Sequence, residues 1–422
     1  MKNCAVKMQG EKVIPVGYNL TEMGIIPSDW KIEQLGNLCT LKSGLSITSK
    51  DIDDSSFYRC FGGNGLRGYT KKYTHDGNFA LIGRQGALCG NIQYVSGQFF
   101  ASEHALVASP TKGVDPKWLS IYLETMNLNQ YSESSAQPGL SAEKLRILKL
   151  ITPNLNEQTA IANVLSDTDA LITELEKLIA KKQAIKTATM QQLLTGRTRL
   201  PQFAKHPDGV LKGNKPSELG LIPEDWICVT LGEIGQCIIG LTYSPRDVSD
   251  TGTLVLRSSN VQNNKLAYQD NVFVNMDLPE RVIVRKGDIL ICVRNGSRKL
   301  IGKCALIDHT AEGCAFGAFM AIYRTKAHDF IFYQFQSNLI HNQIDETMGA
   351  TINQITNKDL SGFIISMPSC DQEQTAIATI LLDMDAELEA LEQKLAKVRD
   401  IKQGMMQQLL TGRIRLPLDR QP

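Results

Sequence analysis

The chain has 422 residues, a formal net charge of +1 and 42% hydrophobic residues. Its length is enough for two or three domains with separate cores, and its composition is typical of a soluble globular protein. A net charge so close to zero indicates neither a nucleic acid nor a membrane as partner, and no run is apolar over the roughly 18 residues that a membrane helix needs.

The first predicted domain covers residues 17–155 and mixes strands with helices. It opens with "TEMGIIPSDWKIEQLG" and continues to "NFALIGRQGALCGNIQYV", where two β-type runs flank the turn Gly83–Gly86. A more helical stretch, "DPKWLSIYLETMNLNQY", and a polar stretch, "SSAQPGLSAEKL", follow. This mixture of strands, turns and helices predicts an α+β domain.

Residues 156–200 are predicted to form a long helix. Apolar side chains recur there at spacings of three and four, the pattern of a coiled-coil seam, which Thr168 and Lys182 weaken. The seam positions are Ile161, Leu165, Thr168, Ile172, Leu175, Ile179 and Lys182. Pro153 precedes the segment, Gly196 suits a left-handed C-terminal residue, and Pro201 prevents the helix from resuming.

The second predicted domain covers residues 201–371 and repeats only the opening of the first. Its "SELGLIPEDWICVTLG" matches the first opening at an offset of 196 residues. It continues with two β-type runs around the turn Arg294–Lys299, in "GDILICVRNGSRKLIGKCALI", and with the helical "DFIFYQFQSNLIHNQI". The polar stretch "TMGATINQITNKDL" ends it, so a second α+β domain is predicted.

Residues 372–417 are predicted to form a second long helix. "QEQTAIATILLDMDAELEALEQKLAKVRDIKQGMMQQLLTGR" matches Asn156–Arg197 without a gap at an offset of 216 residues. Its seam is more regular: Ile377, Leu381, Met384, Leu388, Leu391, Leu395 and Val398. Helices of about 40 residues, roughly 60 Å long, cannot bury such seams alone, so the two are predicted to pack on each other.

The sequence contains no motif typical of a catalytic or metal site. The phosphate-loop, dinucleotide-binding, G-x-S-x-G and H-E-x-x-H patterns are absent, and the ten cysteines form no C-x-x-C pair. We interpret His104, beside Glu103, as an isolated histidine and Asp51–Asp54 as a solvated loop. Cysteines without ribbon spacing and a start without an export signal predict a cytoplasmic protein with no cofactor or metal.

Basic residues gather around the turns of both domains. Seven lie between Arg281 and Lys303, against one acid, and five lie between Arg59 and Arg84, also against one acid. Lysine and arginine neutralise phosphates, while arginine, asparagine and glutamine read base edges. A polar surface explains one such turn, but two favour double-stranded DNA as the partner. The DNA-binding candidates are Asn64, Arg67, Lys71, Lys72, Arg84, Gln85, Arg257, Arg294, Asn295, Ser297, Arg298 and Lys299.

Apolar side chains outside the helical seams are candidates for binding a protein partner, because exposed apolar stripes usually mark interaction surfaces. The alternative is that the chain's own domains cover them. These partner-binding candidates are Leu171, Leu178, Met190, Leu194, Leu382 and Met406.

The repeated motifs resemble those of the specificity subunit of Type I restriction-modification systems over nearly the whole chain. The resemblance lies in "LGLIPEDW", in the helix starts "NEQTAIA" and "QEQTAIA", in the helix ends "QQLLTGR", and in the stretches around Arg84 and Arg294. It implies two mixed α/β target-recognition domains separated by two long antiparallel coiled-coil helices with a pseudo-two-fold internal repeat. Each domain is then expected to read half of a bipartite, asymmetric DNA site, and the helices to set the spacer.

The resemblance also implies the partners. Two modification subunits, which carry the S-adenosylmethionine site and methylate adenine, are expected to dock on the repeated helices, and restriction subunits to join through the complex. The chain is then a non-catalytic subunit with no membrane contact, consistent with the absence of an N-P-P-[FY] motif. Two other classes stay open: a stand-alone DNA methyltransferase, and a coiled-coil scaffold with no role in DNA binding.

Overall fold

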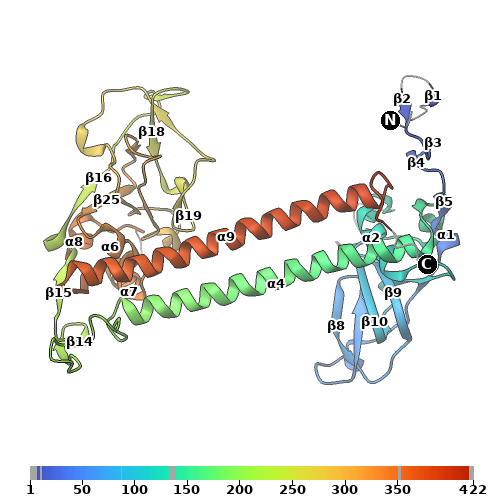
Figure 1. Cartoon of the computed structure of the whole chain (residues 1–422), viewed down its shortest axis with the longest axis horizontal. Coiled ribbons are helices and arrows are strands. Elements are labelled where there is room, and N and C mark those ends of the chain that lie inside the picture. The colour runs from blue at the N-terminus through green and yellow to red at the C-terminus, as the bar shows by residue number, and fades with distance from the viewer. Residues whose placement is uncertain (1–6, 10–11, 87, 133–137, 350–352, 418–422) are drawn as a thin grey trace. The chain divides into compact units, whose positions relative to one another are not determined.

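The computed structural model describes residues 7–9, 12–86, 88–132, 138–349 and 353–417. The chain forms two compact units (Figure 1): unit 1 is Met1–Glu176 with Gln393–Pro422, and unit 2 is Lys177–Glu392. Each unit therefore combines one predicted α+β domain with part of each long helix, and each is described by itself.

Unit 1 is built around a six-stranded sheet. In spatial order its strands are β6 (Cys39–Ser43), β11 (Ala105–Pro110), β9 (His75–Gly83), β10 (Ile92–Ala101), β7 (Tyr58–Gly62) and β8 (Gly65–Thr70). Strands β9 and β10 form an antiparallel hairpin, whereas β10 and β7 run parallel. Side chains of β9 alternate between two cores, with Ala80 and Ile82 in one and Leu81 in the other, as the strand period requires.

Short helices and ribbons complete unit 1. Helix α2 (Pro116–Thr125) begins at Asp115, whose side chain accepts hydrogen bonds from two backbone amides, and it buries Trp118 in the core shared with β9. The remaining elements are β1 (Lys7–Gln9), β2 (Lys12–Ile14), β3 (Tyr18–Thr21), β4 (Gly24–Pro27), β5 (Lys31–Gln34), α1 (Leu35–Leu38), η1 (Ser49–Asp51), η2 (Leu128–Tyr131), α3 (Ala142–Arg146) and β12 (Lys149–Thr152). Strands β5 and β12 pair as an antiparallel ribbon.

Unit 2 contains two four-stranded sheets. One has the order β16 (Gly235–Ile239), β25 (Met320–Thr325), β22 (Ile289–Cys292), β23 (Cys304–Leu306), and the other β17 (Val248–Ser249), β21 (Phe273–Val274), β18 (Thr253–Leu256), β24 (Ala315–Phe316). The ribbons are β13 (Asn214–Ser217) with β14 (Gly220–Pro223), β15 (Trp226–Thr230) with β26 (Ile364–Pro368), and β19 (Val261–Gln262) with β20 (Lys265–Leu266). The helices are α5 (Leu231–Ile234), η3 (Ser258–Asn260), η4 (Glu280–Val282), η5 (Arg298–Leu300), α6 (His328–Phe335), α7 (Asn338–Thr347) and α8 (Asn357–Gly362).

The two domains share a strand arrangement despite their unlike sequences. In unit 1, β6 pairs with β11, β11 with β9, and β10 runs parallel to β7. In unit 2, β16 pairs with β25, β25 with β22, and β24 runs parallel to β18. The predicted α+β class is confirmed, and the arrangement provides a backbone on which residues of the two domains can be matched.

Helices α4 (Leu155–Leu193) and α9 (Asp371–Leu409) are each continuous. Within unit 1, Lys402 pairs with Asp169 at 2.6 Å and Arg399 with Glu176 at 2.5 Å. Within unit 2, Lys186 pairs with Asp385 at 2.5 Å and Lys182 with Glu387 at 2.7 Å. Residue numbers rise along one helix as they fall along the other, so the prediction of antiparallel helices is confirmed.

The predicted seams lie inward. Every seam residue of both helices is buried or half-buried, while Leu171, Leu178 and Leu382 beside them are exposed. Lys182, which interrupts the first seam, forms an ion pair with Glu387 instead of breaking the contact. Gly196 and Gly412 follow the helices with φ of 69° at both, as predicted for left-handed C-terminal residues.

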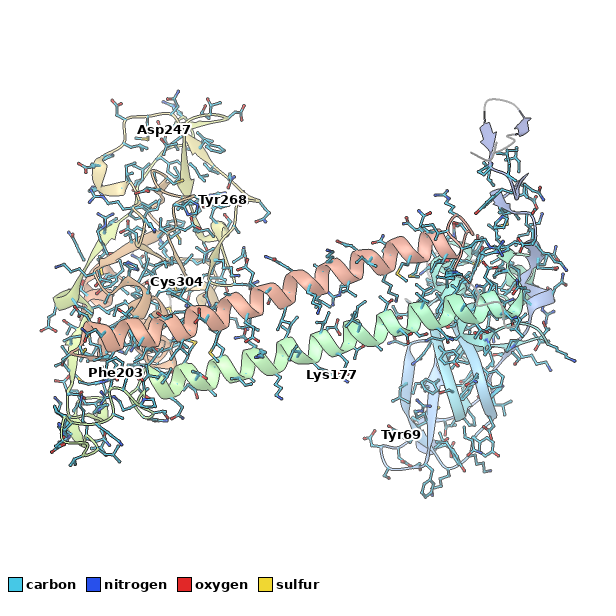
Figure 2. The ribbon with its side chains drawn as sticks, viewed as in Figure 1. Tyr69, Lys177, Phe203, Asp247, Tyr268 and Cys304 are labelled. Atoms are coloured by element: carbon cyan, nitrogen blue, oxygen red, sulfur yellow. The ribbon has the colours of Figure 1, made fainter. Side chains whose placement is uncertain are left out.

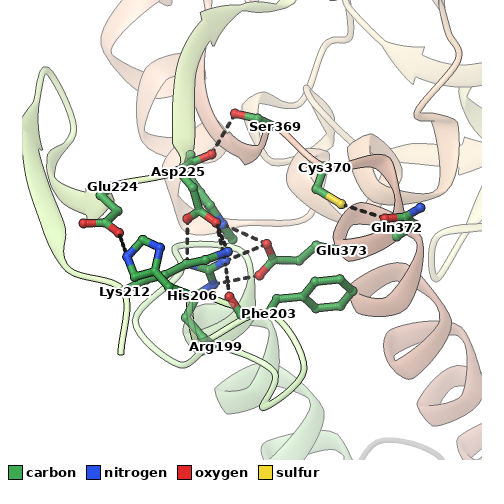
Figure 3. A network of polar contacts seen from close by, with 11 residues as sticks. Arg199, Phe203, His206, Lys212, Glu224, Asp225, Ser369, Cys370, Gln372 and Glu373 are labelled. Atoms are coloured by element: carbon green, nitrogen blue, oxygen red, sulfur yellow. Dashed lines mark hydrogen bonds and ion pairs between the residues drawn. The ribbon is translucent and has the colours of Figure 1, made fainter. Parts of the chain in front are cut away.

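A polar cluster in unit 2 ties the end of α4 to the start of α9 and to the opening motif of the second domain (Figure 3). The Arg199 guanidinium donates to Asp225 at 2.8 Å and to Glu373 at 2.7 Å. The Trp226 indole also donates to Glu373, at 3.3 Å. A Cβ on Gly196 would lie 2.5 Å from Pro223, so glycine is required at this contact. We call this cluster the unit 2 junction.

Unit 1 has a matching cluster, the unit 1 junction. Arg415, after α9, donates to Asp29 at 2.8 Å and to Glu157 at 2.9 Å. The Trp30 indole donates to Glu157 at 3.0 Å. Glycine is again required, because a Cβ on Gly412 would lie 2.5 Å from a proline. The motifs that the sequence repeats most closely are therefore those that form the two junctions.

The aspartate of each junction has a lowered pKa. Burial alone would raise the pKa of Asp225, but hydrogen bonds and charges from Arg199 and Lys212 outweigh it and lower that pKa to about 2. In unit 1, the hydrogen bond from Arg415 lowers the pKa of Asp29. Glu157 and Glu373 are each 1% exposed. A buried carboxylate in this setting depends on its arginine, since an unpaired buried charge is costly.

No helix in the described ranges has the length and apolar character needed to span a membrane.

Candidate nucleic-acid interface

Several segments of unit 1 meet where strand β9 ends. The Arg84 amide donates to the His104 carbonyl at 2.9 Å, and the Ser102 amide donates to the Phe61 carbonyl at 2.8 Å. The Leu140 amide donates to the Arg84 carbonyl at 2.9 Å. These bonds bring the turn after β9, the β10–β11 loop, the end of β7 and the stretch before α3 together. We call this place interface 1.

The same bonds recur in unit 2. The Val293 amide donates to the Phe319 carbonyl at 3.0 Å, and the Gly317 amide donates to the Leu256 carbonyl at 2.9 Å. The Ile355 amide donates to the Val293 carbonyl at 2.9 Å. We call this place interface 2. The correspondence shifts the sequence alignment of the turns by one residue: Val293 takes the place of Arg84.

A close backbone approach is also shared. A Cβ on Gly44 would lie 2.2 Å from the Ala101 carbonyl oxygen, and one on Gly240 would lie 2.1 Å from the Gly317 carbonyl oxygen. Any side chain at either position would push the loop away. Gly44 and Gly240 are therefore part of the scaffold that fixes both interfaces.

Four of the predicted DNA-binding residues of unit 1 lie at or beside interface 1. Half-buried Arg84 donates from Nη1 to Ser43 Oγ at 3.1 Å, and exposed Gln85 has its Oε1 3.1 Å from His104 Nδ1. Arg67 lies across Gly62, where a Cβ would come within 2.6 Å of its Cδ. Asn64 is exposed in the turn between β7 and β8. The cluster offers hydrogen-bond donors and acceptors on an exposed edge.

Lys71 and Lys72 are not part of interface 1. Strand β8 separates them from the turn that carries Asn64, and its six residues span about 20 Å at the usual rise. Figure 2 shows Tyr69, near this end of β8, at the tip of the sheet of unit 1. Both lysines are exposed, so they remain candidates for phosphate contacts only.

Interface 2 gathers four more candidates. The Arg294 guanidinium lies 5.1 Å from the ring centroid of Phe319. Asn295 donates from Nδ2 to Ser258 Oγ at 3.2 Å and accepts at Oδ1 from the Ser297 amide at 3.0 Å. Arg257 donates to Asp270 at 2.9 Å. A cavity of about 720 Å³ adjoins them, lined in part by Tyr243, Arg257, Ser258, Asp270 and Phe319.

Arg298 and Lys299 lie apart from interface 2. Arg298 donates to the backbone carbonyl of Asp345 in α7 at 2.8 Å and to its carboxylate at 3.3 Å. Lys299 is exposed and lines a hollow beside Asp345 and His341. These two cations therefore face α7, whereas Arg294 faces the β24–β25 loop.

The apolar candidates for partner binding divide into two groups. Leu171, Leu178 and Leu382 are 44%, 38% and 38% exposed. The prediction that Met190 and Leu194 point outward is wrong, since they are 9% and 1% exposed and belong to the core of unit 2. The opening motif and α6 of that unit cover them.

The remaining apolar candidate, Met406, is half-buried against the core of unit 1. It shares this environment with Met405 and Leu409, which lie in the same turns of α9. Met406 therefore contributes to the core of unit 1 as well as to its surface.

Sequence patterns do not reveal the side chains that hold the interfaces. His104 reads as an isolated histidine, and Phe319 lies in a run, "FGAFMAIY", that reads as a buried strand. Only the register of β24 and β25 leaves Phe319 at the loop, 56% exposed. An exposed aromatic side chain beside a basic turn would indicate a binding surface. Phe319 gives no such indication in the sequence, because it lies within an apolar run that is typical of a buried strand. The described residues hold no group of three or more histidine, cysteine or acidic side chains placed to bind a metal.

Comparison with known proteins identifies the family. The model of the Type I restriction modification DNA specificity domain matches the chain twice, over residues 27–187 and 223–399. The chain therefore belongs to the family of Type I restriction-modification specificity subunits, as its motifs indicate, with two such domains.

Individual relatives agree with the family. The specificity subunit of the Type I restriction enzyme MjaVIII from Methanocaldococcus jannaschii is 25% identical over 415 residues, covering 93% of this chain and 94% of the relative. The specificity subunit of EcoprrI from Escherichia coli is 46% identical over 155 residues, covering 35% of this chain and 39% of the relative. The higher identity is thus confined to part of the chain.

A solved structure has the same fold. The S subunit of a Type I restriction-modification system from M. genitalium superposes with a TM-score of 0.61 at 19% identity, covering 90% of this chain and 96% of that one. At this identity the likeness shows the fold alone, and it agrees with the two mixed domains and two long helices described above.

Proposed function

We propose that this chain is the non-catalytic, DNA-reading subunit of a Type I restriction-modification complex. The observation that carries the proposal is that one backbone arrangement occurs twice, at interface 1 and interface 2, with different polar side chains on it. The scaffold is repeated while its exposed donors and acceptors change. This suits a protein that recognises two different short base sequences, the half-site words, in one DNA molecule.

Each domain then reads one half of a bipartite, asymmetric site on double-stranded DNA. The recognition domains are residues 17–155 and 201–371, and the helical segments 156–200 and 372–417 set the spacer between the half-sites. Phosphate contacts by exposed lysines and arginines supply affinity, while the amide and guanidinium groups of the turns supply base recognition.

The repeated helices suit a partner that binds twice. We propose that two modification subunits, each an adenine methyltransferase, dock on them, with exposed Leu171, Leu178 and Leu382 among the contacts. Near-identical helix sequences present near-identical surfaces to identical partners. Restriction subunits join through this complex, which works in the cytoplasm.

The proposal is tested by substituting Arg294, Arg298 and Lys299 with alanine in the chain bound to its modification subunits. Methylome sequencing should show a relaxed or altered word at one half-site only. Lys326→Ala is the control, because Lys326 follows β25 at its far end from interface 2. Unchanged methylation and unchanged DNA affinity in the triple variant would show that these turns are surface loops with no role in DNA recognition.

Mass measurement of the complex tests the stoichiometry. A single chain should carry two modification subunits at saturation, and a stable one-to-one complex contradicts the proposal. The open alternatives give other results. A scaffold would form the complex but show no DNA sequence preference, and a stand-alone methyltransferase would bind S-adenosylmethionine without partners.

A further inference from the structure

The two interfaces present unlike side chains at one pair of equivalent positions. Because Val293 takes the place of Arg84 and Phe319 that of His104, Arg294 corresponds to Gln85. Two isolated bridges support this register: Gln85 pairs with Gly139, and Arg294 with Gln354. The pair Gln85–His104 in unit 1 is therefore replaced by Arg294–Phe319 in unit 2.

In unit 1 the second member of the pair orients the first. His104 Nδ1 lies 3.1 Å from Gln85 Oε1, and both residues are exposed. When Nδ1 carries the proton, the histidine donates to the amide oxygen, which fixes which end of the amide is oxygen and which is nitrogen. The other ring nitrogen, Nε2, lies 3.5 Å from Glu103 Oε1, so the neighbouring carboxylate holds the far side of the ring.

In unit 2 the orienting group is a ring. The Arg294 guanidinium lies 5.1 Å from the centroid of Phe319, which is 56% exposed, at the distance of a cation–π contact. A guanidinium stacked on a ring keeps its N–H groups directed outward in its own plane. Across the described ranges, no side-chain hydrogen bond from Arg294 to another residue is present.

Neighbouring arginines differ from Arg294 in that their side chains donate hydrogen bonds to other residues. Arg84 donates to Ser43, Arg257 to Asp270 and Arg298 to Asp345. Each of these guanidinium groups already donates at least one hydrogen bond to a neighbouring side chain, which suits a role in holding the loops. Among the residues that the structure describes, the side chains of Gln85 and Arg294 donate no hydrogen bond, and both residues lie at the corresponding point of the turn.

Resting on the proposed function, we infer that this pair of positions determines one base of each half-site word. Gln85, held by His104, reads adenine through N6 and N7, and Arg294, held by Phe319, reads guanine through O6 and N7, the bidentate pairings that these side chains make in the major groove. His104 and Phe319 are positioning residues that touch no base.

The test exchanges the pairs in the complex with the modification subunits. Gln85→Arg with His104→Phe should change one A·T pair of the first word to G·C and leave the second word intact in the methylome. Arg294→Gln with Phe319→His should make the converse change in the second word. Methylation of unchanged words by either variant would overturn the inference.

Single substitutions keep the test decisive if the exchanged chains do not methylate. Arg294→Ala should lower discrimination between the wild-type site and a site with that one base pair replaced by roughly ten- to a hundredfold. Phe319→Leu should lose part of the same discrimination, and Phe319→Trp should retain it. Undiminished discrimination by Arg294→Ala contradicts the inference. A wild-type methylome with no bipartite word would instead defeat the proposed function itself.

Discussion

The junctions and the interfaces are both present twice in this chain, but they are repeated in different ways. At the junctions an arginine, an aspartate, a glutamate and a tryptophan recur with donor–acceptor distances that agree within 0.3 Å. At the interfaces the backbone hydrogen bonds recur while the side chains change. The difference teaches that the junctions hold the chain's own architecture, whereas the interfaces vary in the way that the proposed reading of two different half-sites requires.

A second pair of equivalents shows how burial changes the value of one contact. Lys186 pairs with Asp385 in unit 2, and Lys402 pairs with Asp169 in unit 1. The Lys186 side chain is 8% exposed and that of Lys402 is 22% exposed. In unit 2 the Tyr333 hydroxyl also donates to Asp385, at 2.7 Å. The two domains thus contact the helices differently although the helices match.

The largest effect is expected from breaking a junction. Glu373→Ala removes the acceptor of Arg199 and Trp226 and leaves a largely buried guanidinium with a single carboxylate partner. Its loss should lower the free energy of unfolding by about 3–5 kcal/mol, measured by urea denaturation. Glu157→Ala should cost less, because the Arg415 side chain is 35% exposed whereas that of Arg199 is 12% exposed. A loss below about 1 kcal/mol in both variants would show that the junctions do not stabilise the fold.

A smaller effect should separate the two helix ion pairs. Asp385→Ala leaves Lys186 buried without its anion and should cost about 3 kcal/mol. Asp169→Ala breaks a more exposed pair and should cost at most about 1 kcal/mol. Urea denaturation of the two variants side by side measures the difference. Equal losses would mean that burial does not distinguish the pairs.

The pH dependence sharpens the account of the unit 2 junction. The pKa of Asp225 is lowered from 3.8 to about 2, so its contribution to stability is fully present above pH 3.8 and is lost as the pH falls through 2. Asp225→Asn should reduce stability at neutral pH and flatten its dependence on pH between about 4 and 2. An identical slope in the variant would show that other carboxylates control acid unfolding.

The sequence predicts the architecture better than the interfaces. Seams, glycine ends and repeated motifs are local patterns, so the two helices and their packing on each other follow from them, whereas their antiparallel direction is what the family resemblance implies. The pairing of Gln85 with His104, or of Arg294 with Phe319, depends on a register between segments that are far apart in the chain. The prediction that Met190 and Leu194 are exposed is wrong for a similar reason, because periodicity along a helix does not reveal which domain covers its outer face.

Under the proposed function, both halves of the chain share one scaffold, and each domain alone determines the base sequence of its half-site. Residues 35–148 can be replaced by residues 231–363, because the backbone bond from Leu35 to Leu148 matches that from Leu231 to Phe363. Methylome sequencing of the complex with this chain should show the second word twice, as an inverted repeat with an unchanged spacer. A word that belongs to neither domain, or a first word that persists, would contradict the account.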